Sequence, residues 1–203
     1  MEQKIDSEIK INERNPKILN DYLESVRDND KERIDSTSKV LSDYIILKVK
    51  EAIKVFYKND AFLLKSKMNE MTVCGRLAMY LQENFKDFKG YYVDIEYYRL
   101  QVPRSDANLR RDRIRCDILF HSRGNQKSRV DNLLAIEAKL EGNTDDGNKD
   151  RSRLEAFVMP ETEDTPEDAI HSTLVGLFLR FGRKCSMTRI IAEEINVDIE
   201  ENE

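Results

Sequence analysis

The sequence predicts a mixed α/β (α+β) fold, with a mixed central sheet of about four to five strands flanked by helices and an N-terminal helical extension. Apolar residues recur at helical spacing up to residue 85, and short apolar or alternating runs follow from residue 91. A helical pattern over 149–158 separates the third strand-like run from the fourth. We therefore expect three antiparallel neighbours, then a helical crossover to a parallel strand, with helices on both faces of the sheet.

The N-terminal part of the chain is predicted to be helical. A short amphipathic pattern around Leu19–Val26 indicates a first helix. Residues 36–38 (Ser-Thr-Ser) offer N-cap chemistry to a second helix, whose apolar residues recur from Val40 to Phe56. A third helix is expected over 65–85, before the glycine at position 90.

Four segments are predicted as strands: 91–100, 114–120, 133–140 and 174–181. Residues 190–195 continue the chain as either a short strand or a helix. We expect 1–60 to form the helical extension, 61–192 the main domain and 193–203 an acidic tail, in which six acids and no base occur.

The composition limits the possible classes of protein. A chain of 203 residues with 39 % hydrophobic and 36 % charged residues indicates a soluble globular protein. No apolar run approaches the roughly 18–20 residues that span a membrane, and the N-terminus lacks the apolar stretch of a signal peptide. Three widely spaced cysteines (Cys74, Cys116, Cys185) predict reduced, buried thiols in a cytoplasmic protein.

Three charged residues lie in apolar runs that otherwise predict buried strands. Asp117 lies in Ile114–Phe120, and Glu137 and Lys139 lie in Leu133–Leu140. Alternation along a strand directs Glu137 and Lys139 to one face. A buried charge without a partner costs several kcal/mol, so such groups are normally paired or bound to a metal. Brought together on neighbouring strands, the three residues would form a magnesium site with a lysine beside it.

A basic segment accompanies these residues. Residues 104–129 hold eight bases and three acids, a local charge of +5 in a chain whose net charge is -5. A basic stretch next to a metal site suits a polyphosphate substrate, although a solvated loop whose arginines pair with acids elsewhere explains it equally well. His121 is expected on the same face as Asp117, at the end of its strand, with an ordinary surface histidine as the alternative. The residues expected to contact substrate are Arg111, Arg113, Arg115, His121 and Arg123.

The pattern resembles that of the PD-(D/E)XK nuclease superfamily over roughly residues 65–181. In this family a helical acid is followed by an Asp on one strand and by Glu-x-Lys on the next. Ala135-Ile-Glu-Ala-Lys139 matches the Glu-x-Lys step, and Arg115-Cys-Asp-Ile-Leu119 stands where the family has Pro-Asp, with Cys116 in place of proline. Glu70 is the best match to the helical glutamate, and Asp150 matches a polar position on the following helix.

The resemblance implies a restriction-endonuclease-like fold and a Mg²⁺ cofactor, with Mn²⁺ as an alternative. Asp117, Glu137 and the Ala138 carbonyl would be metal ligands, since magnesium takes oxygen ligands and keeps several waters. Glu96 on the neighbouring strand would add to the acidic group. Lys139 would orient or help deprotonate the attacking water and stabilise the transition state. Glu70 would hold waters on the metal or support a second ion, which makes Asp117, Glu137, Lys139 and Glu70 the expected catalytic residues.

The implied function is hydrolysis of phosphodiester bonds in nucleic acid, most simply by a DNA endonuclease in defence or DNA processing. Concerted cutting of both strands by single sites would require a homodimer. Two other functions stay open. The chain could be a catalytically inactive nuclease fold that binds nucleic acid or a protein. The strand pair could also have no catalytic role, with Lys139 in a buried structural ion pair with Asp117 or Glu137. The chain could also be a small interaction protein that assembles through its long helix and acidic tail.

Overall fold

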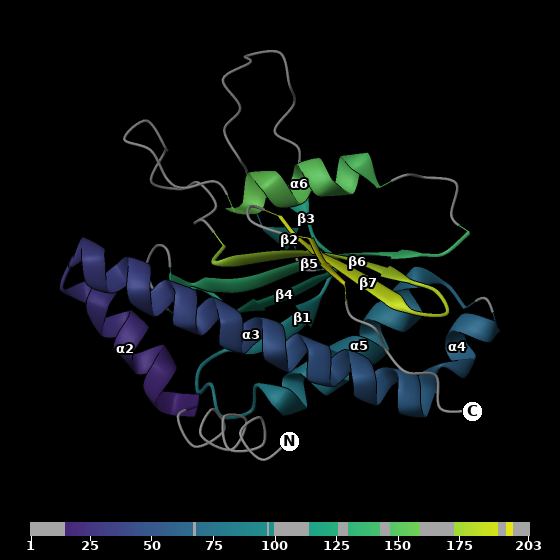
Figure 1. Cartoon of the computed structure of the whole chain (residues 1–203), viewed down its shortest axis with the longest axis horizontal. Helices are drawn as coiled ribbons and strands as arrows, with labels where there is room; N and C mark the ends of the chain where they lie inside the picture. The colour runs from purple at the N-terminus through teal and green to yellow at the C-terminus, as the bar shows by residue number, and fades with distance from the viewer. Residues whose placement is uncertain are drawn as a thin grey trace, which may run out of the picture.

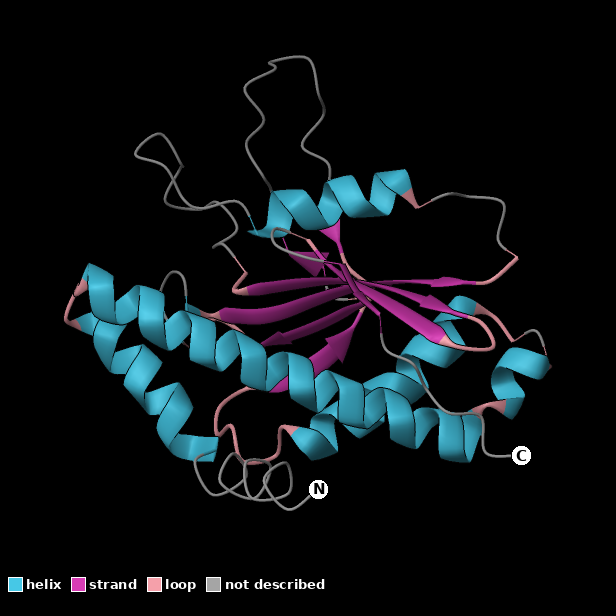
Figure 2. Cartoon of the chain, viewed as in Figure 1, coloured by secondary structure: helices cyan, strands magenta, loops and turns pink. Residues whose placement is uncertain are grey.

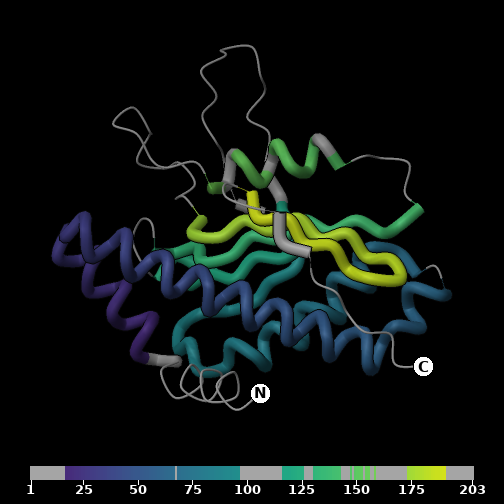
Figure 3. The backbone as a smooth tube through the Cα atoms, viewed as in Figure 1, coloured from purple at the N-terminus to yellow at the C-terminus, as the bar shows by residue number. Residues whose placement is uncertain are grey.

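The computed structural model describes residues 15–66, 68–96, 98–99, 114–125, 130–142, 147–158, 173–190 and 194–196. Over these residues the chain forms three layers. A central sheet lies between helix α6 on one side and helices α2, α3 and α5 on the other (Figures 1 and 2). The tube in Figure 3 shows the C-terminal strands lying beside strands from the middle of the chain. The predicted α+β architecture, with a mixed sheet flanked by helices, is confirmed.

The described strands form one six-stranded sheet in the order β1-β4-β5-β6-β7-β8. The pairs β1–β4 and β4–β5 are antiparallel and β5–β6 is parallel, as expected for three sequential strands followed by a helical crossover. The pairs β6–β7 and β7–β8 are antiparallel. The strands are β1 (Tyr92–Ile95), β4 (Ile118–His121), β5 (Asn132–Leu140), β6 (Val175–Phe181), β7 (Cys185–Arg189) and β8 (Glu194–Asn196).

Two of the predicted strands are interrupted. The run 91–100 breaks at Glu96, whose φ of 49° lies in the left-handed region that non-glycine residues rarely adopt. The run 114–120 breaks at Cys116 and Asp117. The outer pieces, β2 (Tyr98–Arg99) and β3 (Ile114–Arg115), pair in a separate two-stranded ladder. The Glu96 amide donates to the Asp117 carbonyl at 3.0 Å, so both breaks occur at the same level of the sheet.

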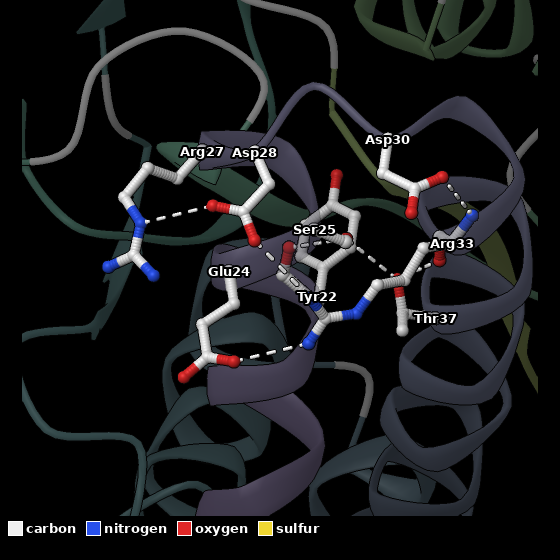
Figure 4. Close-up of polar contacts among 8 residues, drawn as sticks. All are labelled: Tyr22, Glu24, Ser25, Arg27, Asp28, Asp30, Arg33 and Thr37. Atoms are coloured by element: carbon white, nitrogen blue, oxygen red, sulfur yellow. Dashed lines mark hydrogen bonds and ion pairs between the residues drawn. The ribbon is translucent and has the colours of Figure 1, made fainter.

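The N-terminal helices are longer than the sequence indicates. Helices α2 (Asn15–Arg27) and α3 (Lys31–Asp60) are joined by a tight connection, and the side chain of Asp30 caps α3 by accepting from the Arg33 amide. The predicted cap at 36–38 is wrong, because these hydroxyls lie inside α3 and donate to carbonyls three or four residues back. Figure 4 shows this corner of the molecule, where Ser25 and Thr37 join the two helices through hydroxyls 2.9 Å apart.

The predicted helix over 65–85 begins later than expected. A separate short helix, α4 (Phe62–Lys65), ends where it was expected to start, and α5 (Glu70–Asn84) begins after Asn69, whose side chain accepts from the Thr72 amide at 2.8 Å. This cap makes Glu70 the first residue of α5. Helix α6 (Asn148–Val158) matches the predicted crossover helix.

The main apolar core lies between the sheet and helices α3 and α5. Its centre is aromatic: the rings of Phe85 and Phe120 stack at 4.3 Å between centroids, and Phe56 meets Phe181 edge-on at 5.5 Å. Tyr22 of α2 belongs to the same cluster. The helices before residue 60 therefore share one core with the sheet, and the proposed boundary at residue 60 stays a prediction.

The opposite face of the sheet carries a smaller apolar cluster under α6. The buried residues of this cluster are Cys116, Leu119, Ala135, Leu154, Val158, Phe178 and Ile190. All three cysteines are buried and form no disulfide, as predicted. Among the described residues, no helix is both long enough and apolar enough to cross a membrane.

Candidate active site

Asp117 lies at the bend immediately before β4. The last β4–β5 pair is Ile118 with Ile136, so Ala138 lies two residues beyond the paired region. The Asp117 carboxylate takes the place of a strand partner there, and its Oδ2 accepts from the Ala138 amide at 2.7 Å. In an extended strand the N–H and C=O of one residue point to the same side. The Ala138 carbonyl is therefore directed to the side on which Asp117 lies.

Glu137 is buried on the α6 face of the sheet. Its side chain is 1 % exposed, and its neighbour in the parallel register of β5 and β6 is Phe178. Ala135 on the same face belongs to the α6 cluster, whereas Ile136 and Ala138 belong to the main core. The predicted alternation of faces along this strand is therefore confirmed.

Lys139 connects the two helical layers at the end of β5. Its ammonium lies 2.8 Å from Asp150 Oδ2 on α6 and 3.3 Å from Glu70 Oε1 on α5. The Lys139 side chain is 12 % exposed and that of Asp150 is 5 % exposed. Both side chains of this ion pair are largely removed from water. Removal of either one would therefore lower the stability of the fold.

The charges of this region affect the pKa of two buried thiols. Burial raises the pKa of the Cys74 thiol, and the charges of Asp117 and Glu70 raise it further. Glu137 acts in the same direction and Lys139 opposes it. Burial also raises the pKa of the Cys116 thiol, again with contributions from Glu137 and Asp117. The four predicted catalytic residues, separated by up to 69 positions in the chain, therefore all lie near enough to the Cys74 thiol to influence its pKa.

Magnesium binding at these residues stays a prediction. Among the described residues, no three His, Cys, Asp or Glu side chains are grouped as a ready set of ligands. Magnesium commonly binds through one or two carboxylates and retains water on its other positions. Asp117, which uses one oxygen for the Ala138 amide, and Glu137 would supply two such carboxylates, and the Ala138 carbonyl would offer a third oxygen, so this ligand set stays a prediction. Glu96 is joined to Asp117 through the backbone, and its role as a further ligand stays a prediction.

Two of the predicted substrate-binding residues, His121 and Arg123, have side chains that the structure describes. Arg111 and Arg113 lie outside the described residues, as does the side chain of Arg115 in β3. His121 is fully buried and its Nε2 lies 3.0 Å from Asp94 Oδ2, so it is not a surface histidine. A side chain without exposed surface is not positioned to contact a substrate, and His121 is better interpreted as a structural residue.

Arg123 also forms an ion pair with Asp94. Its Nε and Nη2 donate to the two Asp94 oxygens at 2.8 and 2.7 Å, and its guanidinium lies 4.2 Å from the centre of the Tyr92 ring. These hydrogen bonds lower the pKa of the Asp94 carboxyl, and the contact with His121 adds to that effect. The contact with Asp94 corresponds to the alternative in which arginines of the basic segment pair with nearby acids.

Two cations near Lys139 were not predicted. Arg180 of β6 is the register partner of Lys139, and Arg151 follows Asp150 on α6. Arg180 carries the same signal as Lys139, a charge inside an otherwise apolar strand, and could have been found by the same reasoning.

The described site therefore combines Asp117, Glu137, Lys139 and Glu70 with Asp150. Comparison of the chain with models of protein families, with curated protein sequences and with solved structures finds no match.

Proposed function

We propose that this chain is a metal-dependent nuclease of the PD-(D/E)XK kind that hydrolyses phosphodiester bonds in DNA. The observation that carries the proposal is the 2.7 Å contact between Asp117 Oδ2 and the Ala138 amide. This contact joins the Asp to the Glu-x-Lys segment across two strands. The 3.3 Å contact between Lys139 and Glu70 joins the lysine of the pattern to its helical acid.

Each residue has a distinct role in the proposed reaction. Asp117 and Glu137, with the Ala138 carbonyl, would hold a magnesium or manganese ion. The bound ion would supply a more acidic water and neutralise charge on the phosphate. Lys139 would orient the attacking water and stabilise the charge that develops on the phosphate oxygens. Glu70 and Asp150 hold the Lys139 ammonium in place through their contacts of 3.3 and 2.8 Å.

A catalytically inactive module that binds nucleic acid or protein is the second candidate. The observation that favours it is the position of Lys139, which lies between two carboxylates in the manner of a structural ion pair. This alternative predicts salt-sensitive DNA binding with no requirement for a metal.

The decisive experiment is a cleavage assay with supercoiled, linear, branched and single-stranded DNA in Mg²⁺ or Mn²⁺. We expect the wild-type chain to cut at least one of these substrates. Asp117→Asn and Lys139→Met should each lower the rate at least about 100-fold, because each removes charge stabilisation from the transition state. Lys54→Met, which changes an exposed lysine on α3, is the matched control and should cut at the wild-type rate.

Stability must be separated from catalysis in this assay. Lys139→Met removes the ammonium that contacts the buried Asp150 and should lower folding stability. The double variant Lys139→Met/Asp150→Asn also removes the charge of Asp150 and should fold better, yet still fail to cut. An unchanged rate in Lys139→Met would contradict the proposal. DNA binding by the wild type without cleavage under any metal condition would favour the inactive module.

The proposal also concerns the location of the protein and its oligomeric state. We propose that the protein acts in the cytoplasm, where its three buried thiols stay reduced. We also propose a homodimer on DNA, because one such site cuts one strand at a time. Sedimentation of the chain with and without duplex DNA tests the dimer, and a monomer on DNA that makes double-strand breaks would contradict it.

A further inference from the structure

Two basic segments far apart in the chain meet at one end of the sheet. Residues 174–189 hold four bases and no acid, and residues 57–66 hold two bases and one acid. The Tyr57 hydroxyl donates to the Gly182 carbonyl at 3.0 Å, which joins the end of α3 to the turn between β6 and β7. This turn, the end of α3 and helix α4 lie together on the right of Figure 1. The fold therefore concentrates positive charge at this end of a chain whose net charge is -5.

Three cations of this surface are exposed: Lys58 in the last turn of α3, Lys65 at the end of α4 and Arg183 in the β6–β7 turn. No ion pair or hydrogen bond joins these three side chains to another described residue. The single acid of the first segment, Asp60, is buried and accepts from Arg76 Nε at 2.8 Å, so it is directed toward α5. Exposed cations of one sign without neutralising partners attract a negatively charged partner.

The β6–β7 turn is fixed beside the strand that carries Lys139. Glu141 follows Lys139 by two residues, and its amide donates to the Phe181 carbonyl at 2.6 Å. The Glu141 carboxylate accepts from the backbone amide of Arg183 at 3.3 Å and packs against Gly182, where a Cβ would collide with it. The turn is therefore held at the end of β5, and the guanidinium of Arg183 is not used to hold it.

Helix α4 leads into the proposed site from the other side. After α4 the Met68 amide donates to the Leu63 carbonyl at 3.1 Å, and the chain enters α5 at Glu70. The Glu70 carboxylate contacts the Lys139 ammonium at 3.3 Å. Lys65 therefore precedes by five residues the acid that contacts Lys139. Both segments that meet at the Lys139–Glu70 contact thus continue into exposed cations.

We propose that Lys58, Lys65 and Arg183 form a binding surface for the phosphate backbone of DNA, beside the proposed catalytic residues. Lysine and arginine contacts to phosphates fix the position of a nucleic acid without reading its sequence. The choice of DNA as the polyanion rests on the proposed nuclease function, whereas the concentration of exposed positive charge does not. This surface is separate in sequence from the basic segment 104–129.

The test is DNA binding by the full chain in EDTA, which prevents metal-dependent cleavage. Fluorescence anisotropy of a labelled duplex and of a labelled single strand gives the affinity at several salt concentrations. The triple variant Lys58→Met/Lys65→Met/Arg183→Met should bind more weakly and lower the slope of log affinity against log salt by about three, one for each lost phosphate contact. Its melting temperature should stay close to that of the wild type, because all three side chains are exposed.

Two matched variants isolate the effect of charge. Lys58→Arg/Lys65→Arg/Arg183→Lys keeps all three charges and should keep the wild-type slope. Lys39→Met removes an exposed lysine from the first half of α3 and should bind like the wild type. Its position lies roughly 28 Å from that of Lys58 along the helix axis.

A purely structural role for the lysines gives a different result. Lysines that only complement the C-terminal ends of α3 and α4 would lower the melting temperature of the triple variant and leave its salt slope unchanged. That result would overturn the proposed surface.

The remaining outcomes distinguish this inference from the proposed function. If the wild type cuts DNA and the triple variant binds with wild-type affinity and slope, the surface is wrong and the nuclease proposal survives. If the triple variant loses affinity and slope but no metal supports cleavage by the wild type, the surface stands and the nuclease proposal fails. A wild type that binds neither DNA at low salt would overturn the surface, and the cleavage assay would then decide the nuclease proposal by itself.

Discussion

The two faces of the central sheet have different compositions. The face covered by α3 and α5, here called the helix-pair face, is apolar and rich in packed aromatic rings, with Phe85, Phe88 and Tyr91 all in contact with Phe120. The face covered by α6 has a smaller apolar cluster, and at the end of β5 and β6 it carries Glu137 and Lys139. Stability and candidate chemistry are thus divided between opposite sides of the same strands.

This division has a physical cause. A buried charge costs free energy unless it is paired, and pairing rarely makes it better than an apolar residue of the same size. Glu137 is 1 % exposed and Asp150 is 3 % exposed. The α6 face therefore carries the desolvation cost of two carboxylates within one small region. The helix-pair face can offset it because alternate residues of the same strands bury apolar side chains there. Mutations on the helix-pair face should therefore mainly lower stability, and mutations on the α6 face should mainly affect the proposed activity.

The largest expected effect is the loss of an aromatic ring on the helix-pair face. Phe120→Ala removes a fully buried side chain from the centre of the stack and should destabilise the protein by about 3–5 kcal/mol. Urea unfolding followed by circular dichroism measures this loss. Phe62→Ala, which alters a side chain with 57 % exposure, is the control and should change stability by less than about 0.5 kcal/mol.

Phe120→Ala also tests whether the two faces are independent. Cleavage per folded molecule should stay at the wild-type level below the unfolding transition, because Phe120 belongs to the main core, whereas Glu137 lies on the α6 face beside Phe178. A stable fraction that has lost cleavage would show that the aromatic face also shapes the site.

Much of this division could be predicted from the sequence. The apolar runs around residues 118 and 136 predicted the antiparallel pair, and the helical pattern over 149–158 predicted the parallel return. Period-two alternation placed Glu137 and Lys139 on one face, which the structure confirms. These features are local or periodic, and a single sequence contains them.

Other features depend on contacts that no local pattern records. The breaks at Glu96 and Asp117 arise because two strands end together, joined by the Glu96 amide and the Asp117 carbonyl. Helix α3 starts at Lys31 because Asp30 caps it. The residues at 36–38 are equally suitable cap residues, so the sequence alone does not decide between the two starts. β7 was missed because Cys185 and Met187 are only two buried positions in a five-residue strand.

The second expected effect is stabilisation by metal on the α6 face. Magnesium bound by Asp117 and Glu137 would relieve repulsion among four carboxylates, and binding to the folded state alone stabilises it by about 2.7 kcal/mol at 100 times the dissociation constant. A titration of melting temperature against Mg²⁺ should therefore rise in the wild type and stay flat in Asp117→Asn.

The control for metal binding lies on the other side of the molecule. Asp43→Asn changes an exposed carboxylate on α3 and should give the wild-type titration. An identical rise in Asp117→Asn would mean that the ion binds elsewhere, and the magnesium assignment would then be wrong even if the fold is unaffected.

The smallest expected effect concerns a polar clamp on the helix-pair side. Asp60 at the end of α3 is buried, and it accepts from Arg76 Nε at 2.8 Å and from the Tyr80 hydroxyl at 2.5 Å. Burial alone would raise the pKa of Asp60, but the hydrogen bonds from Tyr80 and Arg76 outweigh it, so the pKa is lowered from its ordinary 3.8. A carboxyl with a lowered pKa in the folded state stabilises the protein fully above 3.8 and loses that contribution as the pH falls through the folded pKa.

Asp60→Asn should therefore cost about 1–1.5 kcal/mol near neutral pH, because the remaining Arg76 can still be solvated. The difference from wild type should shrink as the pH falls well below 3.8, where both side chains are uncharged. Urea unfolding across this pH range measures it, with Tyr80→Phe as a variant that removes one hydrogen bond and should lose less. A difference that is constant with pH would mean that Asp60 acts through packing alone.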